Sequence, residues 1–172
     1  MENIILMITG SLLYSFSTTP KRKNRCRVGD TKCTVSQFTK NDKFIKSVNK
    51  KGDVMHFCET GNNTATFGII TMQLKKKPAT ANKSKILGDF INSLHSSLNI
   101  KHHVGLSYGY SQKGNNQVIG MEDYWQDEKG MDWKVKGWTD GRTYGFLFVK
   151  NISAISSVET DAYLDSFRFA AR

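Results

Sequence analysis

The sequence has little proline and cysteine, and no apolar run long enough to cross a membrane as a helix. It contains 2 prolines among 172 residues and is 38% hydrophobic, which argues against an extended disordered chain. Its 3 cysteines fit no zinc-binding spacing. A chain of this length buries roughly 70% of the surface that its unfolded form exposes, so it can fold without a metal or a disulfide. From these absences we expect one globular domain of ordinary size.

Motifs of the common enzyme classes are also absent. The stretch from Gly105 to Gly114 is rich in glycine, but it lacks the spacing and the following helix of a phosphate-binding loop. The G-x-S-x-G pattern of serine hydrolases does not occur. We therefore predict that the protein is not an enzyme and that it uses no cofactor.

Acidic residues nevertheless gather in one part of the chain. The cluster comprises Glu122, Asp123, Asp127, Glu128 and Asp132. Most of its members flank a turn, where carboxylates are normally solvated. Glu122 is the exception, because it shares a strand face with Tyr124 beside apolar neighbours, and burial would raise the pKa of its carboxyl group. A small hydrolase-type enzyme that uses the carboxylates around Glu122 is therefore an alternative interpretation.

The histidines offer no metal site that the sequence alone can identify. His102 and His103 are adjacent, and adjacent residues on a strand point to opposite faces of the sheet. The two imidazoles cannot bind one ion together, so we expect no metal site.

Positive charge is concentrated towards the N-terminus. The net charge is +10, and residues 1–51 carry 11 of the 25 Lys and Arg but only 3 of the 15 Asp and Glu. Such a segment docks on nucleic acid or an anionic surface without base specificity, or it serves only as a solubilising arm. We assign residues 18–51 to a basic arm that precedes a folded domain at residues 52–172. The densest basic run contains Lys21, Arg22, Lys23, Arg25 and Arg27.

Residues 1–17 have the pattern of an export signal. The apolar run from Ile4 to Leu13 has the length of a signal-peptide hydrophobic region, and Ser15 and Ser17 suit a cleavage site. Glu2 stands where a basic residue is expected, so a first strand or a buried helix is the alternative. We predict a periplasmic or extracellular protein with no transmembrane span in its mature chain. The protein is cytoplasmic if this run is not a signal.

Export would place the cysteines in an oxidising compartment. Cys26 and Cys33 could then close a small disulfide loop. Cys58 would remain a free thiol. It alternates with His56 on a predicted strand, which is typical of a buried and unreactive cysteine.

Three antiparallel strands are predicted in the stretch that holds all three tryptophans. Phe146–Val149 is apolar at every position, which is typical of a central strand covered on both faces. Trp138 lies on the face otherwise occupied by lysines, which indicates that a helix covers part of its strand. Asp140 and Gly141 predict a type I′ turn with positive φ at both positions. The three strands are expected at Gln117–Gln126, Met131–Thr139 and Arg142–Asn151.

Two helices and three further strands complete the prediction. Apolar residues recur at helical spacing over Ser84–Leu98, with Ser84 as the N-cap. A second helix, Val158–Phe167, follows a capping box formed by Ser156 and Glu159. Its inner face is expected to contain Val158, Tyr163 and Phe167, and the further strands are expected at Asp53–Glu59, Thr64–Leu74 and Val104–Gln112.

This order of elements resembles the PsbP-like and Mog-type α/β/α sandwich proteins. Ala162–Phe169 is similar to the closing helix motif of that superfamily, and Gly120–Tyr124 and Trp133–Trp138 are similar to its central strands. The resemblance covers Lys51–Phe169. It implies an α+β fold in which helices pack on an antiparallel sheet.

The same resemblance implies a binding or assembly module without catalytic residues. We expect such a module to bind another protein or an envelope component. Exposed aromatic residues would carry the binding, and we select Tyr110, Trp125 and Trp138. Nucleic acid, held by the basic arm, is the alternative partner.

Export can be tested on the protein itself. If residues 1–17 are a signal, the mature chain made in a native-like host begins near Thr18, because cleavage follows the small residue Ser17. Intact-mass measurement of the secreted or periplasmic fraction checks this. A cytosolic protein that retains Met1 to Ser17 would contradict it.

Overall fold

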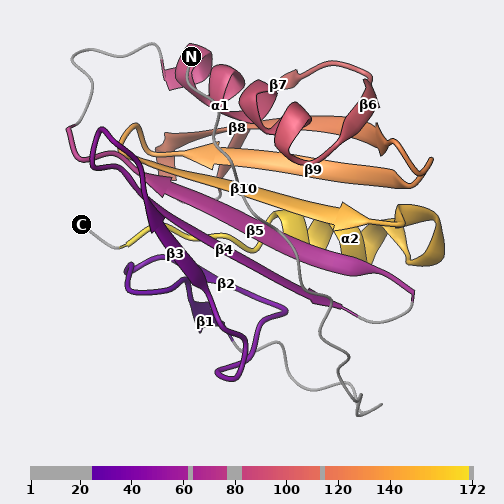
Figure 1. Ribbon diagram of the computed structural model, residues 1–172, viewed down its shortest axis with the longest axis horizontal. Helices are drawn as coiled ribbons and strands as arrows, with labels where there is room; N and C mark the ends of the chain where they lie inside the picture. The colour runs from indigo at the N-terminus through magenta and orange to yellow at the C-terminus, as the bar shows by residue number, and fades with distance from the viewer. Residues whose placement is uncertain (1–24, 62–63, 77–82, 113–114, 171–172) are drawn as a thin grey trace.

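An antiparallel sheet forms most of the described molecule (Figure 1). The computed structural model describes residues 25–61, 64–76, 83–112 and 115–170. Within them, eight strands form one sheet in the order β3-β4-β5-β10-β9-β8-β6, and β7 also pairs with β8. The strands of this sheet are β3 (Ile45–Val48), β4 (Val54–Gly61), β5 (Thr66–Gln73), β6 (Ile100–His103), β7 (Ser107–Gln112), β8 (Asn115–Asp127), β9 (Asp132–Thr139) and β10 (Thr143–Lys150). Together with two helices, this sheet confirms the predicted α+β class.

The centre of the sheet is β10, which lies between β5 and β9. Phe146 and Phe148 point to one face of the sheet, and Leu147 and Val149 point to the other. All four side chains are fully buried, so the prediction of a central strand covered on both faces is confirmed.

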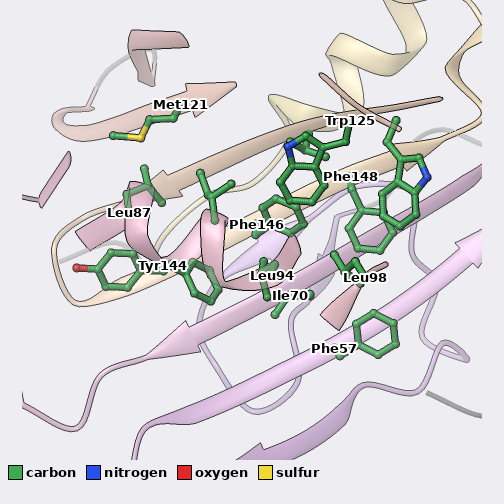
Figure 2. Close-up of a cluster of buried hydrophobic side chains, with 14 of the residues drawn as sticks. Phe57, Ile70, Leu87, Leu94, Leu98, Met121, Trp125, Tyr144, Phe146 and Phe148 are labelled. Carbon is green, nitrogen blue, oxygen red and sulfur yellow. The ribbon is translucent and has the colours of Figure 1, made fainter. Parts of the chain in front are cut away.

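Helix α1 (Lys83–Ser97) covers one face of the sheet (Figure 1). Its predicted apolar stripe packs on aromatic side chains of β8 and β10, and Figure 2 shows Leu87 and Leu94 in this cluster. Gly137 of β9 lies directly below the helix, where an added Cβ would come 2.6 Å from Ile91 Cδ1. The absence of a side chain there lets the helix approach the sheet. Ser84 is the second residue of α1 and therefore is not its N-cap.

Helix α2 (Ser157–Leu164) packs on the opposite face, after a short 3-10 helix at Ile152–Ala154. Trp138 Nε1 donates a hydrogen bond of 2.9 Å to the Leu164 carbonyl, which confirms that a helix covers this part of β9. The backbone N–H of Glu159 donates to Ser156 Oγ at 3.1 Å, so Ser156 is the N-cap, as predicted. Of the predicted inner face, Tyr163 and Phe167 are fully buried, but Val158 is exposed.

A small hairpin before the large sheet contributes to the same face as α2. It consists of β1 (Cys26–Arg27) and β2 (Thr34–Val35), and Thr34 also bridges to Arg168 near the C-terminus. Val28, Cys33, Val35 and Phe38 are buried in one cluster with Tyr163, Leu164 and Phe167. The predicted boundary at Gly52 therefore does not hold, because the folded part already includes these residues. Residues 1–24, with the predicted signal and the first part of the arm, lie outside the described residues.

The turn between β9 and β10 differs from the predicted type I′ geometry. Gly141 has a φ of 93°, but Asp140 does not adopt positive φ. Instead, Asp140 Oδ1 accepts hydrogen bonds from the backbone N–H groups of Arg142 and Thr143, at 2.9 and 2.8 Å. The Thr139 hydroxyl also takes part, because it accepts from the Gly141 N–H at 2.9 Å and donates to the Thr143 carbonyl at 2.8 Å. Side chains of Thr139 and Asp140 thus close a turn that has one left-handed residue.

The φ of Gly141 predicts the effect of a substitution. Gly141→Val should destabilise the protein by about 1–2 kcal/mol, because a β-branched residue at positive φ is strained. An added Cβ would also come 3.0 Å from Lys83 Cε. Urea denaturation measures the change, with Arg142→Val in the same turn as the control, expected within about 0.5 kcal/mol of the native protein. Equal effects of the two substitutions would show that backbone strain is not the cause.

Candidate functional site

The predicted binding aromatics occupy different environments. Trp125 and Trp138 are each 2% exposed, so the expectation that they lie on the surface is wrong for both. Trp125 stacks on Phe146, with ring centroids 5.2 Å apart, and Trp138 lies under α2. Tyr110 is half-buried, with Lys136 Nζ above its ring at 4.1 Å from the centroid. The indole rings of Trp125 and Trp138 therefore lie in the core, where burial of their large apolar surface stabilises the fold.

Glu122 lies between two lysines on the sheet face below α2. Its carboxylate is 3.3 Å from Lys134 Nζ and 3.5 Å from Lys136 Nζ. All three side chains are about nine-tenths buried. They meet because residues 122 and 136 are directly paired across β8 and β9, and residue 134 lies two positions along the same face. The surroundings of Glu122 are therefore ionic, whereas the sequence had indicated apolar ones.

Helix α2 completes this ionic network with two more carboxylates. Asp161 lies 2.6 Å from Lys134 Nζ, and Asp165 lies 2.7 Å from Lys136 Nζ. Burial would lower the pKa of Lys134, but its hydrogen bonds to Asp161, Tyr124 and Glu122 raise that pKa above the ordinary value for lysine. Lys134 therefore keeps its proton at neutral pH and is a poor base or nucleophile.

The network can fasten α2 to the sheet. Each buried ammonium group has two carboxylate neighbours, and such pairs are costly to break because one charge then stays buried without a partner. Aromatic rings add to this, since Lys134 and Lys136 also lie over Tyr124 and Tyr110. The charged residues of the network are therefore explained by their contribution to holding α2 on the sheet.

A surface hollow lies on the other side of the sheet, between α1 and β7. Its volume is about 340 Å³. Gly88 of α1 leaves the hollow open, and Tyr108 of β7 borders it with 65% of its surface exposed. Neither residue was identified from the sequence. Regular alternation would place Tyr108 and Tyr110 on the same face, but a register shift of β7 between them turns the two rings to opposite faces. The lining consists of Ser84, Lys85, Gly88, Asp89, Asn92, Leu106 and Tyr108.

The predicted disulfide is not formed, because all three cysteines are free thiols. Cys26 pairs with Val35 across the β1–β2 hairpin, which makes Cys33 its diagonal neighbour. Diagonal Cβ atoms lie roughly 7 Å apart, beyond the roughly 4 Å that a disulfide needs. Cys58 is buried as predicted, and burial raises the pKa of its thiol to about 12.

Only part of the predicted basic run lies within the described residues. Arg25 is bound to the folded part, since its guanidinium donates to Thr34 Oγ1 at 3.1 Å and to the Ser166 carbonyl. Burial, and then Arg168, lower the pKa of Arg25. Arg27 is exposed in β1. Lys21, Arg22 and Lys23 lie outside the described residues.

The chain was compared with family models and with curated proteins. No family model matches the chain. No curated protein matches it either. Among the described residues, no helix has both the length and the apolar character that a membrane span requires.

The ionic network predicts a specific loss of stability. Glu122→Gln should destabilise the protein by about 2–3 kcal/mol, since it leaves two buried ammonium groups without the carboxylate between them. The loss stays below that of a fully broken pair because Asp161 and Asp165 remain. Urea denaturation measures it, with Asp89→Asn as the control. That substitution breaks an exposed pair with Lys85 and should cost less than about 0.5 kcal/mol. An equally small loss for Glu122→Gln would mean that the network does not stabilise the fold.

Proposed function

We propose that this chain is an exported, non-catalytic binding or assembly module with a PsbP-like α/β/α sandwich fold. The position of α1 and α2 on opposite faces of one antiparallel sheet supports the sandwich. The apolar run of residues 1–17 supports export. The partner is another protein, of which an extended segment lies along the hollow between α1 and β7.

The exposed tyrosine beside this hollow carries the proposal. Tyrosine combines a large rigid apolar ring with a hydroxyl group, and it is enriched at protein interfaces for that reason. Tyr108 holds this ring on the surface at the rim of a concavity, where a partner can cover it. Ser84, Asp89 and Asn92 of α1 supply polar groups on the opposite rim, which suits the backbone of an extended peptide.

The edge of the sheet at this place also suits an extended partner. Among the described residues β7 pairs only with β8, so its outer edge has backbone groups available for hydrogen bonds. Val104, just before β7, is 82% exposed and adds apolar surface. The combination of an open edge, a concavity and an aromatic ring favours a protein segment over a compact small molecule.

The charged residues of the opposite face support a non-catalytic role. A general acid or base needs a proton that it can exchange with a substrate. Glu122, Lys134 and Lys136 instead face one another and α2. The contacts of Arg25 with Thr34 and Ser166 also weaken the case for a separate polyanion-binding arm.

The proposal predicts which surface residue the partner needs. A photo-crosslinking amino acid at position 108 should capture one segment of the partner, which mass spectrometry then identifies. A synthetic peptide of that segment should bind Tyr108→Ala at least tenfold more weakly than the native protein, because the ring loses its contact.

The matched control is Val158→Ala on α2. Val158 is equally apolar and is 77% exposed, but it lies on the other face of the molecule. Affinity should be unchanged in this variant. Equal affinity of Tyr108→Ala and the native protein for the peptide would overturn the proposal.

A further inference from the structure

Three side chains that bind metal ions in other proteins meet at the end of α1. His95 lies in the last turn of α1, His103 ends β6, and Asp123 lies in the middle of β8. One ligand atom of each residue lies within 4.8 Å of those of the other two. The residues come from three separate elements, and this is why the adjacent pair of His102 and His103 did not identify the site.

Asp123 is held in position by hydrogen bonds from three N–H groups. Its Oδ1 accepts from the backbone N–H of Gly105 and of Tyr124, each at 2.8 Å. Its Oδ2 accepts from Trp125 Nε1 at 2.9 Å and lies 3.8 Å from His103 Nδ1. The carboxylate is buried but retains lone-pair capacity on the side of the histidines. Metal-binding carboxylates are typically oriented by such outer hydrogen bonds.

His95 has a ring nitrogen that no protein group satisfies. Its Nε2 atom is buried and has no hydrogen-bond partner. The ring stacks on His103 and meets the edge of Trp125, with both centroid distances at 4.6 Å. An imidazole nitrogen without a protein partner is the atom through which histidine binds a metal ion.

We propose that His95, His103 and Asp123 form a binding site for a divalent transition-metal ion, and that zinc is the ion it fits best. Two imidazoles and one carboxylate are a common zinc ligand set, whereas calcium and magnesium prefer oxygen ligands alone. The proposal is independent of the function proposed for the hollow.

The three ligands must move closer together to hold zinc. Ligand atoms in a tetrahedral zinc site lie roughly 3.4 Å apart, so atoms up to 4.8 Å apart must close by roughly 1.4 Å. The stacked rings of His95 and His103 must also turn, so that a nitrogen of each points at the ion. His103 can make most of this movement, since half of its side chain is exposed. Its exposure also leaves the fourth position of the ion open to water or to a ligand from a partner protein.

Zinc binding to the untagged, full-length chain tests the proposal. After treatment with a chelator, the protein is titrated with zinc in competition with a chromophoric chelator. We expect one zinc ion per chain with a Kd in the micromolar range or tighter. Cobalt should bind at the same place and give the visible absorption of a four- or five-coordinate site. His103→Ala should weaken zinc binding at least tenfold and remove the cobalt spectrum.

Two control variants separate this site from other metal-binding groups. His102→Ala removes the neighbouring imidazole, which lies opposite Gln126 in the strand pairing and outside the cluster. Cys26→Ser removes the most accessible of the three thiols. Both variants should bind zinc as the native protein does, and thermal melts without metal should show that all three variants fold. The proposal is overturned if the native chain binds no zinc, if His103→Ala binds it unchanged, or if either control loses as much affinity as His103→Ala.

Discussion

Burial of β10 on both faces is the constraint on which the rest of the structure depends. Its side chains alternate between two apolar clusters, so neither face of the sheet can remain open to water. Helix α1 covers one face. The other face needs α2, the β1–β2 hairpin and the segment that ends at Phe169. The small hairpin is thus part of the core that a central strand of this kind requires, although half of its residues are polar.

Covering the second face buries positive charge, which nearby carboxylates neutralise. Lys134 and Lys136 point to the same face as Trp138, so a helix that covers the tryptophan also removes water from the lysines. Buried ammonium groups need carboxylate partners, and Glu122, Asp161 and Asp165 provide them. The chemistry that suggested an active site in the sequence is therefore explained by the packing of one helix.

Local patterns in the sequence were sufficient for the elements whose side chains repeat regularly. The stripe of α1, the apolar centre of β10 and the N-cap at Ser156 depend on neighbours within a few residues. Contacts across long separations were not accessible in this way. The docking of Val28 and Val35 against Tyr163 depends on residues more than 120 positions away, and the meeting of His95, His103 and Asp123 depends on the pairing of β6 with β8. The burial of Trp125 could not be predicted from the sequence for the same reason, because it depends on packing against Phe146 and other residues that are distant in the sequence.

The link between the two ends of the described chain has a consequence for the order of folding. Thr34 pairs with Arg168, and Arg25 contacts the carbonyl of Ser166. The first hairpin can complete this docking only after Arg168 has been synthesised, and the contact between Thr34 and Arg168 closes a loop of more than 130 residues. We expect slow, late completion of folding, as for other topologies with high contact order. Until then, the face of the sheet that the hairpin helps to cover keeps part of its apolar surface in water, which leaves the incomplete fold prone to aggregation.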